Sequence, residues 1–310
     1  MERCKNAQGI GILGFENRGF RTIVAPAYNR SMKNSPCILC GQCVNVCPTG
    51  ALMEKSEIDK LDQAKKEGKY IVVQTAPAVR AALGEEFGMP IGTSVTGKMV
   101  AALKRLGFDK VYDTNFAADL TIMEEATELL HRIKEGGQLP MITSCSPGWV
   151  NYAEYFYGDL LGHLSSCKSP HEMEGAIIKS YFAEKQGLDP KNIFVVSIMP
   201  CTAKKYEKER PENASKEGLK DVDCVLTTRE LARLIKRSGI DFRRLPDEEF
   251  DQDLLGEYTG AGVIFGVTGG VMEAALRTAY FTVTGKEHEL ITFKEVRGFD
   301  GLKEAEIDLN

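Results

Sequence analysis

Three segments decide the fold class: YIVVQTAPAV at 70–79, PMITSCSPGW at 140–149 and IFVVSIMPCTAKK at 193–205. Each begins with a short β-rich run (YIVVQ, PMITS, IFVVSIM), which is typical of a buried parallel strand. Each run leads directly into a turn-forming motif. Because ligands bind beyond the carboxyl ends of the strands in open α/β sheets, we expect the three motifs to converge on one site.

Two helical patterns separate the first two of these segments. They are GKMVAALKRLGF (97–108) and DLTIMEEATELLHRIKEGG (119–137). We expect the first helix to end at Gly107 and the second just before Gly136, because glycine suits a helix C-terminus. In each, apolar residues share one face: Met99, Val100 and Leu103 in the first, and Ile122, Ala126, Leu129 and Ile133 in the second. We predict two crossover helices, and hence an α/β domain.

The first 55 residues differ in character from the rest. They are rich in Gly, Pro and Cys and lack helical periodicity. We place a domain boundary in the charged stretch 54–69, which predicts an N-terminal module over 1–55 and a larger domain over 68–310.

The pattern Cys37-x-x-Cys40-x-x-Cys43-x-x-x-Cys47-Pro48 is the strongest chemical signal in the chain. This spacing is typical of bacterial ferredoxins, in which closely spaced thiolates bind a 4Fe-4S cluster. A zinc site is the weaker interpretation, because zinc ligands usually fall into two separated pairs.

Cys4 leaves two ligand sets open. In ferredoxins with two such runs, the last cysteine of each run binds the other run's cluster. On that pattern Cys4, Cys37, Cys40 and Cys43 hold one cluster, and Cys47 belongs to a second cluster whose other cysteines lie before Met1. The alternative makes Cys47 the fourth ligand of the first cluster and Cys4 a stray thiol.

Composition narrows the function classes. With 43% hydrophobic and 27% charged residues, the 310-residue chain has the content of a globular protein with a sizeable core. The net charge of −5 argues against a nucleic-acid partner. We expect no membrane span and no secretory signal in MERCKNAQGIG, and hence a cytoplasmic protein whose nine cysteines serve metal or redox chemistry.

Four segments together identify a family resemblance: TAPAVRAALGEEFG (75–88), MITSCSPGW (141–149), IMPCTAKKYE (198–207) and GAGVIFGVTGGVMEAALR (260–277). They resemble successive segments of the iron-only (FeFe) hydrogenases, over nearly the whole chain. The implied fold class is α/β: an N-terminal ferredoxin-like iron-sulfur module, followed by a two-lobed active-site domain with parallel sheets. The implied cofactor is the H-cluster, a 4Fe-4S cube joined through a cysteine to a two-iron subcluster carrying CO, cyanide and an amine-bearing dithiolate.

The resemblance also implies roles for residues at the active site. Cys201 matches a ligand of the cube, Cys145 matches the proton-relay thiol, and Lys204 matches the lysine that donates to one cyanide. A bound cyanide carries negative charge and is well held by an ammonium in a dry cavity. The remaining matches are the backbone segment around the other cyanide (Ala76, Pro77 and Ala78), the pocket-lining positions Met199, Pro200 and Phe265, and His171 at the pocket rim.

A proton path is implied as well. Glu125, Glu128 and Arg132 fall on one helical face, which without the family would suggest an exposed ion-pair stripe. The resemblance implies that protons run from Cys145 through Glu125 and Ser165 to Glu128 and Arg132. Such relays need groups of suitable pKa within hydrogen-bond reach of one another or of a bridging water.

Two departures from the family pattern stand out. Ser146 occupies the position of a second cysteine that ligates the cube in most members, so either Cys145 takes over ligation or this corner is altered. The chain also stops at EAEIDLN, before the glycine-rich motif whose cysteine bridges cube and subcluster. We therefore expect a catalytic subunit truncated at both ends, which by itself does not hold a working H-cluster.

The predicted function is interconversion of protons, electrons and H2, with electrons relayed through 4Fe-4S clusters. Expected partners are ferredoxin or NADH-linked diaphorase subunits, together with hydrogenase maturation proteins. The alternative is a non-catalytic relative, either a hydrogenase-like sensor or an iron-sulfur assembly protein. Such relatives commonly lose the relay thiol, whereas Cys145 is present. Cys167 and Cys224 are interpreted as core-filling thiols.

Overall fold

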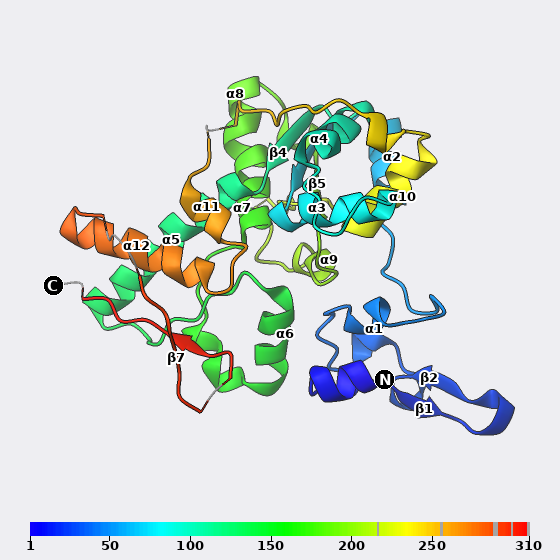
Figure 1. Cartoon of the computed structure of the whole chain (residues 1–310), viewed down its shortest axis with the longest axis horizontal. Coiled ribbons are helices and arrows are strands. Elements are labelled where there is room, and N and C mark those ends of the chain that lie inside the picture. Colours follow the sequence, from blue (N-terminus) through cyan, green and yellow to red (C-terminus); the bar gives the residue numbers. More distant parts are fainter. Residues whose placement is uncertain (216, 255–256, 288–290, 299, 309–310) are drawn as a thin grey trace.

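A parallel four-stranded sheet organises the larger part of the chain (Figure 1). The computed structural model describes all residues except 216, 255–256, 288–290, 299 and 309–310. The strand order is β4-β3-β5-β6. The bounds are β3 (Tyr70–Thr75), β4 (Lys110–Asp113), β5 (Ile193–Met199) and β6 (Cys224–Thr227). Two of the three predicted strands, β3 and β5, are therefore confirmed, and they pair directly with each other.

The two central strands are buried on both faces. Val72 and Val73 of β3, like Val195 and Val196 of β5, have no exposed surface. A strand covered on both sides carries apolar residues in succession rather than in alternation, which is why these runs were readable in the sequence.

Helices cover both faces of this sheet (Figure 1). The α-helices are α1 (Gln42–Asn45), α2 (Ile58–Lys66), α3 (Pro77–Ala82), α4 (Thr96–Arg105), α5 (Asn115–Glu135), α6 (Pro147–Phe156), α7 (Pro170–Ile177), α8 (Ala183–Gln186), α9 (Lys204–Glu207), α10 (Thr228–Arg237), α11 (Gly260–Ile264) and α12 (Gly270–Thr284). Helices α2, α4 and α10 lie on one side of the strands, and α7 with α8 on the other. The burial of their apolar faces against the strands is the main source of stability for this region.

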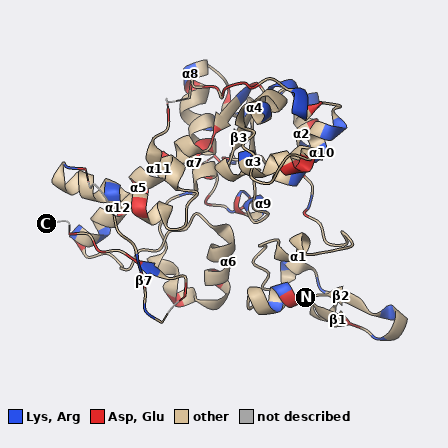
Figure 2. Cartoon of the chain, viewed as in Figure 1, with Lys and Arg blue, Asp and Glu red and all other residues tan. Residues whose placement is uncertain are grey.

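Oppositely charged residues are interspersed on the covering helices (Figure 2). Arg237 of α10 pairs with Asp62 of α2 at 2.8 Å, and Arg233 pairs with Glu54 at 2.6 Å. The arginine side chains of both pairs are half exposed, whereas the Glu54 side chain is buried. Ion pairs that water reaches contribute little stability, so these pairs add only modestly to the packing of α10.

Helix α5 leads away from the sheet into a second, helical lobe, where it packs against α7, α11 and α12. The predicted helix and its terminal Gly136 are confirmed, with Gly136 at φ 72°. The predicted apolar face is only partly correct: Ile122 and Ala126 are buried, but Ile133 is 47% exposed and Leu130 takes the buried position in the last turns.

The predicted strand at 140–144 is wrong. Ile142 makes an isolated parallel bridge with Leu164 and belongs to no named strand. Its N–H donates to the His163 carbonyl, and its own carbonyl accepts from the Ser165 N–H. The apolar run is thus real, but among the described residues no neighbouring strand extends that bridge into a ladder.

The N-terminal segment lies beside this body (Figure 1). It contains an antiparallel hairpin of β1 (Gly14–Glu16) and β2 (Ile23–Ala25), the short π-helix Arg3–Ala7 and helix α1. Near the other terminus, β7 (Lys294–Glu295) and β8 (Lys303–Glu304) form a second short antiparallel pair. In the described part of the chain, no helix is long and apolar enough to cross a membrane.

Candidate active site

A cavity of about 190 Å³ lies at the carboxyl ends of β3 and β5. Thr75 and Ile198 are paired near the ends of these strands, so the following turns start side by side. The cavity wall comprises Ala76, Pro77, Thr114, Asn115, Ala118, Cys145, Pro170, His171, Met199, Pro200, Cys201, Lys204 and Phe265. The three motifs that follow the predicted strands therefore converge, as expected for an open α/β sheet.

Two thiols face this cavity from different segments. Cys201 lies two residues after the end of β5, and Cys145 precedes α6. Burial raises the pKa of the Cys145 thiol above its usual value, so this thiol keeps its proton at neutral pH. Ser146, the departure from the family pattern, is exposed and does not belong to the cavity wall.

Lys204 is held at the cavity by two acceptors. Its ammonium donates to the Cys145 carbonyl at 2.9 Å and to Glu207 Oε2 at 2.7 Å. Burial raises the pKa of Glu207, but the Lys204 ammonium and the hydrogen bonds from Lys204 and His171 outweigh burial and hold that pKa at about 2. Lys204 and Glu207 therefore form an ion pair within one helical turn, at i and i+3 of α9.

His171 is buried and closes another part of the wall. Its Nε2 lies 2.5 Å from Glu207 Oε2, and its Nδ1 lies 3.1 Å from Ser197 Oγ. Burial and the nearby charge of Lys204 lower the pKa of His171 to about 4, so the ring is neutral at pH 7. A neutral ring that donates from Nε2 to the Glu207 carboxylate accepts at Nδ1 from the Ser197 hydroxyl.

Glu172 stands out beside this network because both of its carboxyl oxygens are buried without a hydrogen-bond partner among the described residues. Burial raises its pKa to about 9, which keeps it protonated and neutral. Ligand atoms of His171, Glu172 and Glu207 lie within 4.8 Å of one another, the spacing of a metal site. Because Glu207 already pairs with the Lys204 ammonium, its charge is balanced without an ion.

A second chain of polar groups approaches Cys145 from α5. Glu125 is 1% exposed and its Oε2 has no partner among the described residues. Burial raises the pKa of Glu125 to about 7, a value suited to giving and taking protons at neutral pH. Its charge in turn raises the pKa of Cys145, as expected for a neighbour of that thiol.

Glu128 lies one helical turn further along α5. The Ser165 hydroxyl donates to its Oε2 at 2.8 Å, and Arg132 donates twice to its Oε1, at 2.6 and 3.0 Å. Although partial burial raises its pKa, these hydrogen bonds hold the pKa of Glu128 below its usual range. The sequence interpretation of Cys167 as core-filling is wrong: Cys167 is half-buried and its Sγ lies 3.5 Å from Glu128 Oε2. Cys224, by contrast, is fully buried in the sheet core, as predicted.

Four thiols line a separate small pocket in the N-terminal segment: Cys4, Cys37, Cys40 and Cys43. Cys4 comes from the π-helix Arg3–Ala7. The rest of the wall is mostly apolar, with Ile10, Leu13 and Ile38 among its residues. Cys47 is not part of this wall. Its sulfur accepts from the Leu52 N–H at 3.5 Å, and this bond and the Thr49 hydroxyl lower its pKa to about 7.

A hydrogen bond connects a residue beside the four-thiol pocket with a residue beside the cavity. The Thr202 hydroxyl, next to Cys201, donates to the Leu39 carbonyl, next to Cys40, at 2.9 Å. Gly41 has φ 72°, and a Cβ at this position would lie 2.5 Å from Thr202 Oγ1. A glycine is therefore required here by both conformation and space.

The matched positions differ in how their side chains lie relative to the cavity. Ala76, Pro77, Met199, Pro200 and Phe265 all line the cavity. The Ala78 side chain, in the first turn of α3, is exposed and does not line it, so the prediction for this position rests on its backbone alone.

Asn115, Glu172 and Glu207 were missed in the sequence. Of these, only Glu207 had a readable signal, its i+3 spacing from Lys204 in KKYE.

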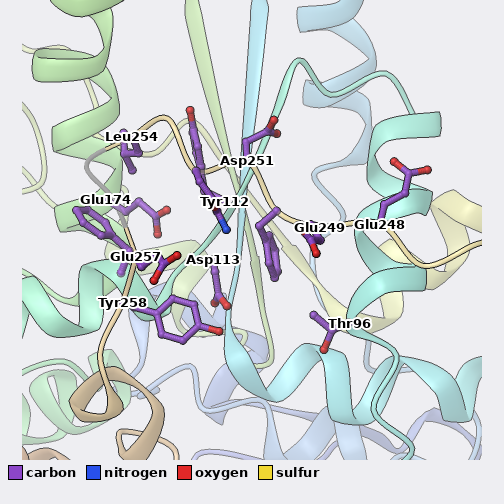
Figure 3. Close-up of a pocket in the computed structure, with 13 residues that line it drawn as sticks. Thr96, Tyr112, Asp113, Glu174, Glu248, Glu249, Asp251, Leu254, Glu257 and Tyr258 are labelled. Carbon is purple, nitrogen blue, oxygen red and sulfur yellow. The ribbon is translucent and has the colours of Figure 1, made fainter.

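A cavity of about 430 Å³ lies elsewhere, at β4 and residues 248–254 and 257–258 (Figure 3). Its wall carries carboxylates and aromatic rings, including Glu174, Asp113, Tyr112 and Tyr258, but no thiol. Glu174 is fully buried, and burial holds its pKa well above the usual range. Asp113 is neutralised by Arg80 at 2.6 Å. The donors that suit iron-sulfur chemistry belong to the smaller cavity and to the four-thiol pocket.

Comparison with known proteins finds one family match over the part of the chain that contains the cavity and another over the part that contains most of the four-thiol pocket. Residues 69–310 match the family described as the iron only hydrogenase large subunit, C-terminal domain. The chain belongs to this family. Residues 34–53 match a 4Fe-4S binding domain.

Similar proteins cover nearly all of the hydrogenase-family chain. The NADP-reducing hydrogenase subunit HndD of Solidesulfovibrio fructosivorans is 54% identical over 98% of this chain and 53% of its own length. Iron hydrogenase 1 of Clostridium pasteurianum is 50% identical over 99% of this chain and 54% of its own length. This chain thus spans about half the length of these two relatives.

A solved structure shows the same fold. An apo [FeFe]-hydrogenase HydA1 variant from Chlamydomonas reinhardtii superimposes with a TM-score of 0.70 and 47% identity, over 78% of this chain and 63% of that one. The predicted fold class is confirmed, with a 4Fe-4S segment ahead of an α/β domain that contains a parallel sheet. Both expected cofactor types, a 4Fe-4S cluster and an H-cluster, fit the matched family.

Proposed function

We propose that this chain forms the catalytic core of an enzyme that interconverts H2 with protons and electrons at an H-cluster. The observation that carries the proposal is the meeting of two features at Cys145: a thiol-lined cavity at the strand ends, and a chain of acids leading away from it. A hydrogen-converting site needs both a place for the metal group and a route for protons.

The residues of the cavity suit the implied group. Cys201 and Cys145 supply thiols, Lys204 supplies a fixed ammonium, and the remaining wall is mostly apolar. Asn115 also lines the cavity, and its Oδ1 is buried without a partner in the described part of the chain. Such an orphaned polar atom suits a cavity that receives a polar ligand. When bound, the H-cluster supplies the iron at which electrons and protons combine.

The chain's own residues divide the remaining work. Cys201 would hold the cube, and Lys204, oriented by Glu207 and His171, would hold an anionic cyanide. Cys145 and Glu125 would carry a proton between the cavity and Ser165. Because Glu125 has a pKa of about 7, it exchanges protons without a large energetic penalty near neutral pH.

For electrons, we propose entry through a 4Fe-4S cluster held by Cys4, Cys37, Cys40 and Cys43. All four thiols line one pocket, which supports this set over the alternative with Cys47. The hydrogen bond from Thr202 to Leu39 joins the pocket to the turn that bears Cys201, so the two metal sites share a direct contact.

The finer assignments follow from this proposal. Electron partners would be ferredoxin or NADH-linked subunits, assembly would need hydrogenase maturation proteins, and the free thiols suit a cytoplasmic location. The non-catalytic alternative, a sensor or a cluster-assembly protein, is less well supported because Cys145 faces the cavity beside Glu125.

The test is to supply matured two-iron cofactor to the iron-reconstituted chain and to a version extended to the length of its relatives, which carries the glycine-rich segment. Hydrogen evolution is then measured with a reduced dye. We expect evolution from the extended version, and little from the chain alone, because a cube joined to two further irons needs more thiolates than Cys145 and Cys201 provide. An extended version that holds its iron and evolves no H2 would refute the proposal.

A further inference from the structure

The outer end of the acid chain lies at Glu128, and Arg132 is poorly suited to pass protons beyond it. The Arg132 guanidinium donates to Glu128 Oε1, to the Leu164 carbonyl at 2.7 Å and to the Gln138 carbonyl at 3.1 Å. Arginine stays protonated in proteins and has no acceptor atom. Arg132 therefore fixes Glu128 and the neighbouring loop, and protons must reach Glu128 at its other oxygen.

That other oxygen, Glu128 Oε2, has three neighbours on the segment Ser165–Cys167. The Ser165 hydroxyl donates to it at 2.8 Å, the Ser166 N–H donates at 3.0 Å, and Cys167 Sγ lies at 3.5 Å. The Cys167 N–H in turn donates to Ser165 Oγ at 3.2 Å, which directs the Ser165 hydroxyl hydrogen toward Glu128. Ser165 serves the inner side, and Cys167 offers an S–H group on the outer side.

Cys167 also borders the routes to solvent. It lines two cavities, of about 360 and 330 Å³. Their walls include the exposed residues Ser166, Glu124 and Ser180, so water can enter them. Burial raises the pKa of the Cys167 thiol to about 11, so it remains protonated at neutral pH and able to donate.

We propose that Cys167 is the outer relay residue of the proton path, passing protons between water in these cavities and Glu128 Oε2. During uptake, a proton from water binds the sulfur while the existing S–H hydrogen moves to Oε2. An O–H bond of a hydronium ion and the old S–H bond break, a new S–H bond and an O–H bond on Glu128 form, and the thiol ends unchanged beside a water molecule and a neutral carboxyl group. Release runs in reverse. This role rests on the proposed hydrogen turnover and adds to it a residue outside the family-derived set.

The contact itself can be tested without turnover. The infrared S–H stretching band of Cys167 is obtained by subtracting the spectrum of Cys167→Val from that of the unmodified chain. If the thiol donates to Glu128, the band moves to higher frequency in Glu128→Gln, because a neutral amide oxygen is a weaker acceptor than a carboxylate. A band that does not move would overturn the proposal. Cys224→Ala, which removes a core thiol, is the control and should leave this band in place.

Turnover is measured in the extended, cofactor-loaded enzyme. Cys167→Val replaces the S–H group by two methyl groups, which cannot donate and which exclude water, so we expect H2 evolution to fall about tenfold, with a changed solvent isotope effect. Cys167→Ser keeps a donor and should stay within about threefold of the unmodified enzyme. Equal rates and isotope effects in all three would overturn the relay. Inactivity of the unmodified enzyme would refute the proposed function, and the infrared band would then decide the contact alone.

Discussion

The N-terminal segment and the sheet region bury their residues in very different ways. In residues 1–55, the buried aliphatic side chains are Leu13, Ala25 and Ile38, and large side chains such as Phe20 are fully exposed. The sheet region has one continuous core that includes strands β3 to β6 and their covering helices. The contrast suggests that a bound cluster, rather than apolar burial, stabilises the N-terminal segment.

Removing iron tests whether residues 1–55 depend on a bound cluster for their folding. We expect the chelator-treated chain to lose hydrogen-exchange protection across residues 1–55, while β3 and β5 remain protected, because metal-binding energy is folding energy in a segment with little core. Exchange measured by mass spectrometry would report both regions at once. Equal protection of residues 1–55 with and without iron would contradict the account.

Substituting single cysteines sharpens the same point. Cys4→Ala and Cys40→Ala should each abolish binding of the 4Fe-4S cluster in the N-terminal segment, because both thiols line the pocket. Cys47→Ala is the matched control and should leave this cluster intact. Iron content and the visible absorption of the reconstituted chains measure the effect, and the reverse pattern would assign Cys47 as the fourth ligand.

The contact between the two regions depends on Gly41. Gly41→Ala introduces a Cβ that would overlap Thr202, so we expect destabilisation of about 2 kcal/mol and a weakened junction between the pocket and the cavity. Gly50→Ala is the control, since Gly50 has a similar φ of +65° but no atom within 4 Å of its Cβ. Thermal unfolding of both variants gives the comparison, and similar losses in the two would show that backbone strain alone accounts for the effect.

Within the sheet region, single capping contacts should matter little. Thr227 and Glu230 form a reciprocal capping box at the start of α10. Thr227→Ala should cost about 1 kcal/mol, because it leaves a buried N–H without its acceptor, whereas Thr227→Ser keeps the hydroxyl. Denaturant unfolding checks the difference. A loss of the whole sheet region in Thr227→Ala would contradict the picture of a core held by broad apolar burial.

The sequence predicted those parts of the fold that carry their own signal. Strands β3 and β5 were readable because they are apolar on both faces, and α4 because Met99, Val100 and Leu103 fall at helical spacing, although the structure buries the whole run Met99–Leu103. The four-residue strands β4 and β6 were not predicted, since runs as short as KVYD and CVLT have too little pattern. The segment 140–144 has a strand-like composition, but composition does not supply a pairing partner.

Some residues of the candidate site were likewise predictable from the sequence, and others were not. Cysteine spacing and family motifs predicted the thiols that line the pocket and the cavity. The contacts of Cys167 with Glu128 could not be predicted, because 39 positions separate the two residues and only the fold brings them together. Likewise, the buried pair of His171 and Glu207 depends on the packing of α7 against α9 and β5 rather than on local sequence.

The proposed hydrogen chemistry depends on Glu125, which we propose carries protons to the cavity. Its most direct test is hydrogen evolution by the extended, cofactor-loaded enzyme with Glu125→Gln, followed across pH. A neutral amide keeps the size of the side chain but cannot exchange protons, so we predict a loss of about 10²-fold or more at unchanged iron content. We also predict that the variant loses the part of the pH profile that titrates near pH 7. Unchanged turnover with an unchanged profile would contradict the account.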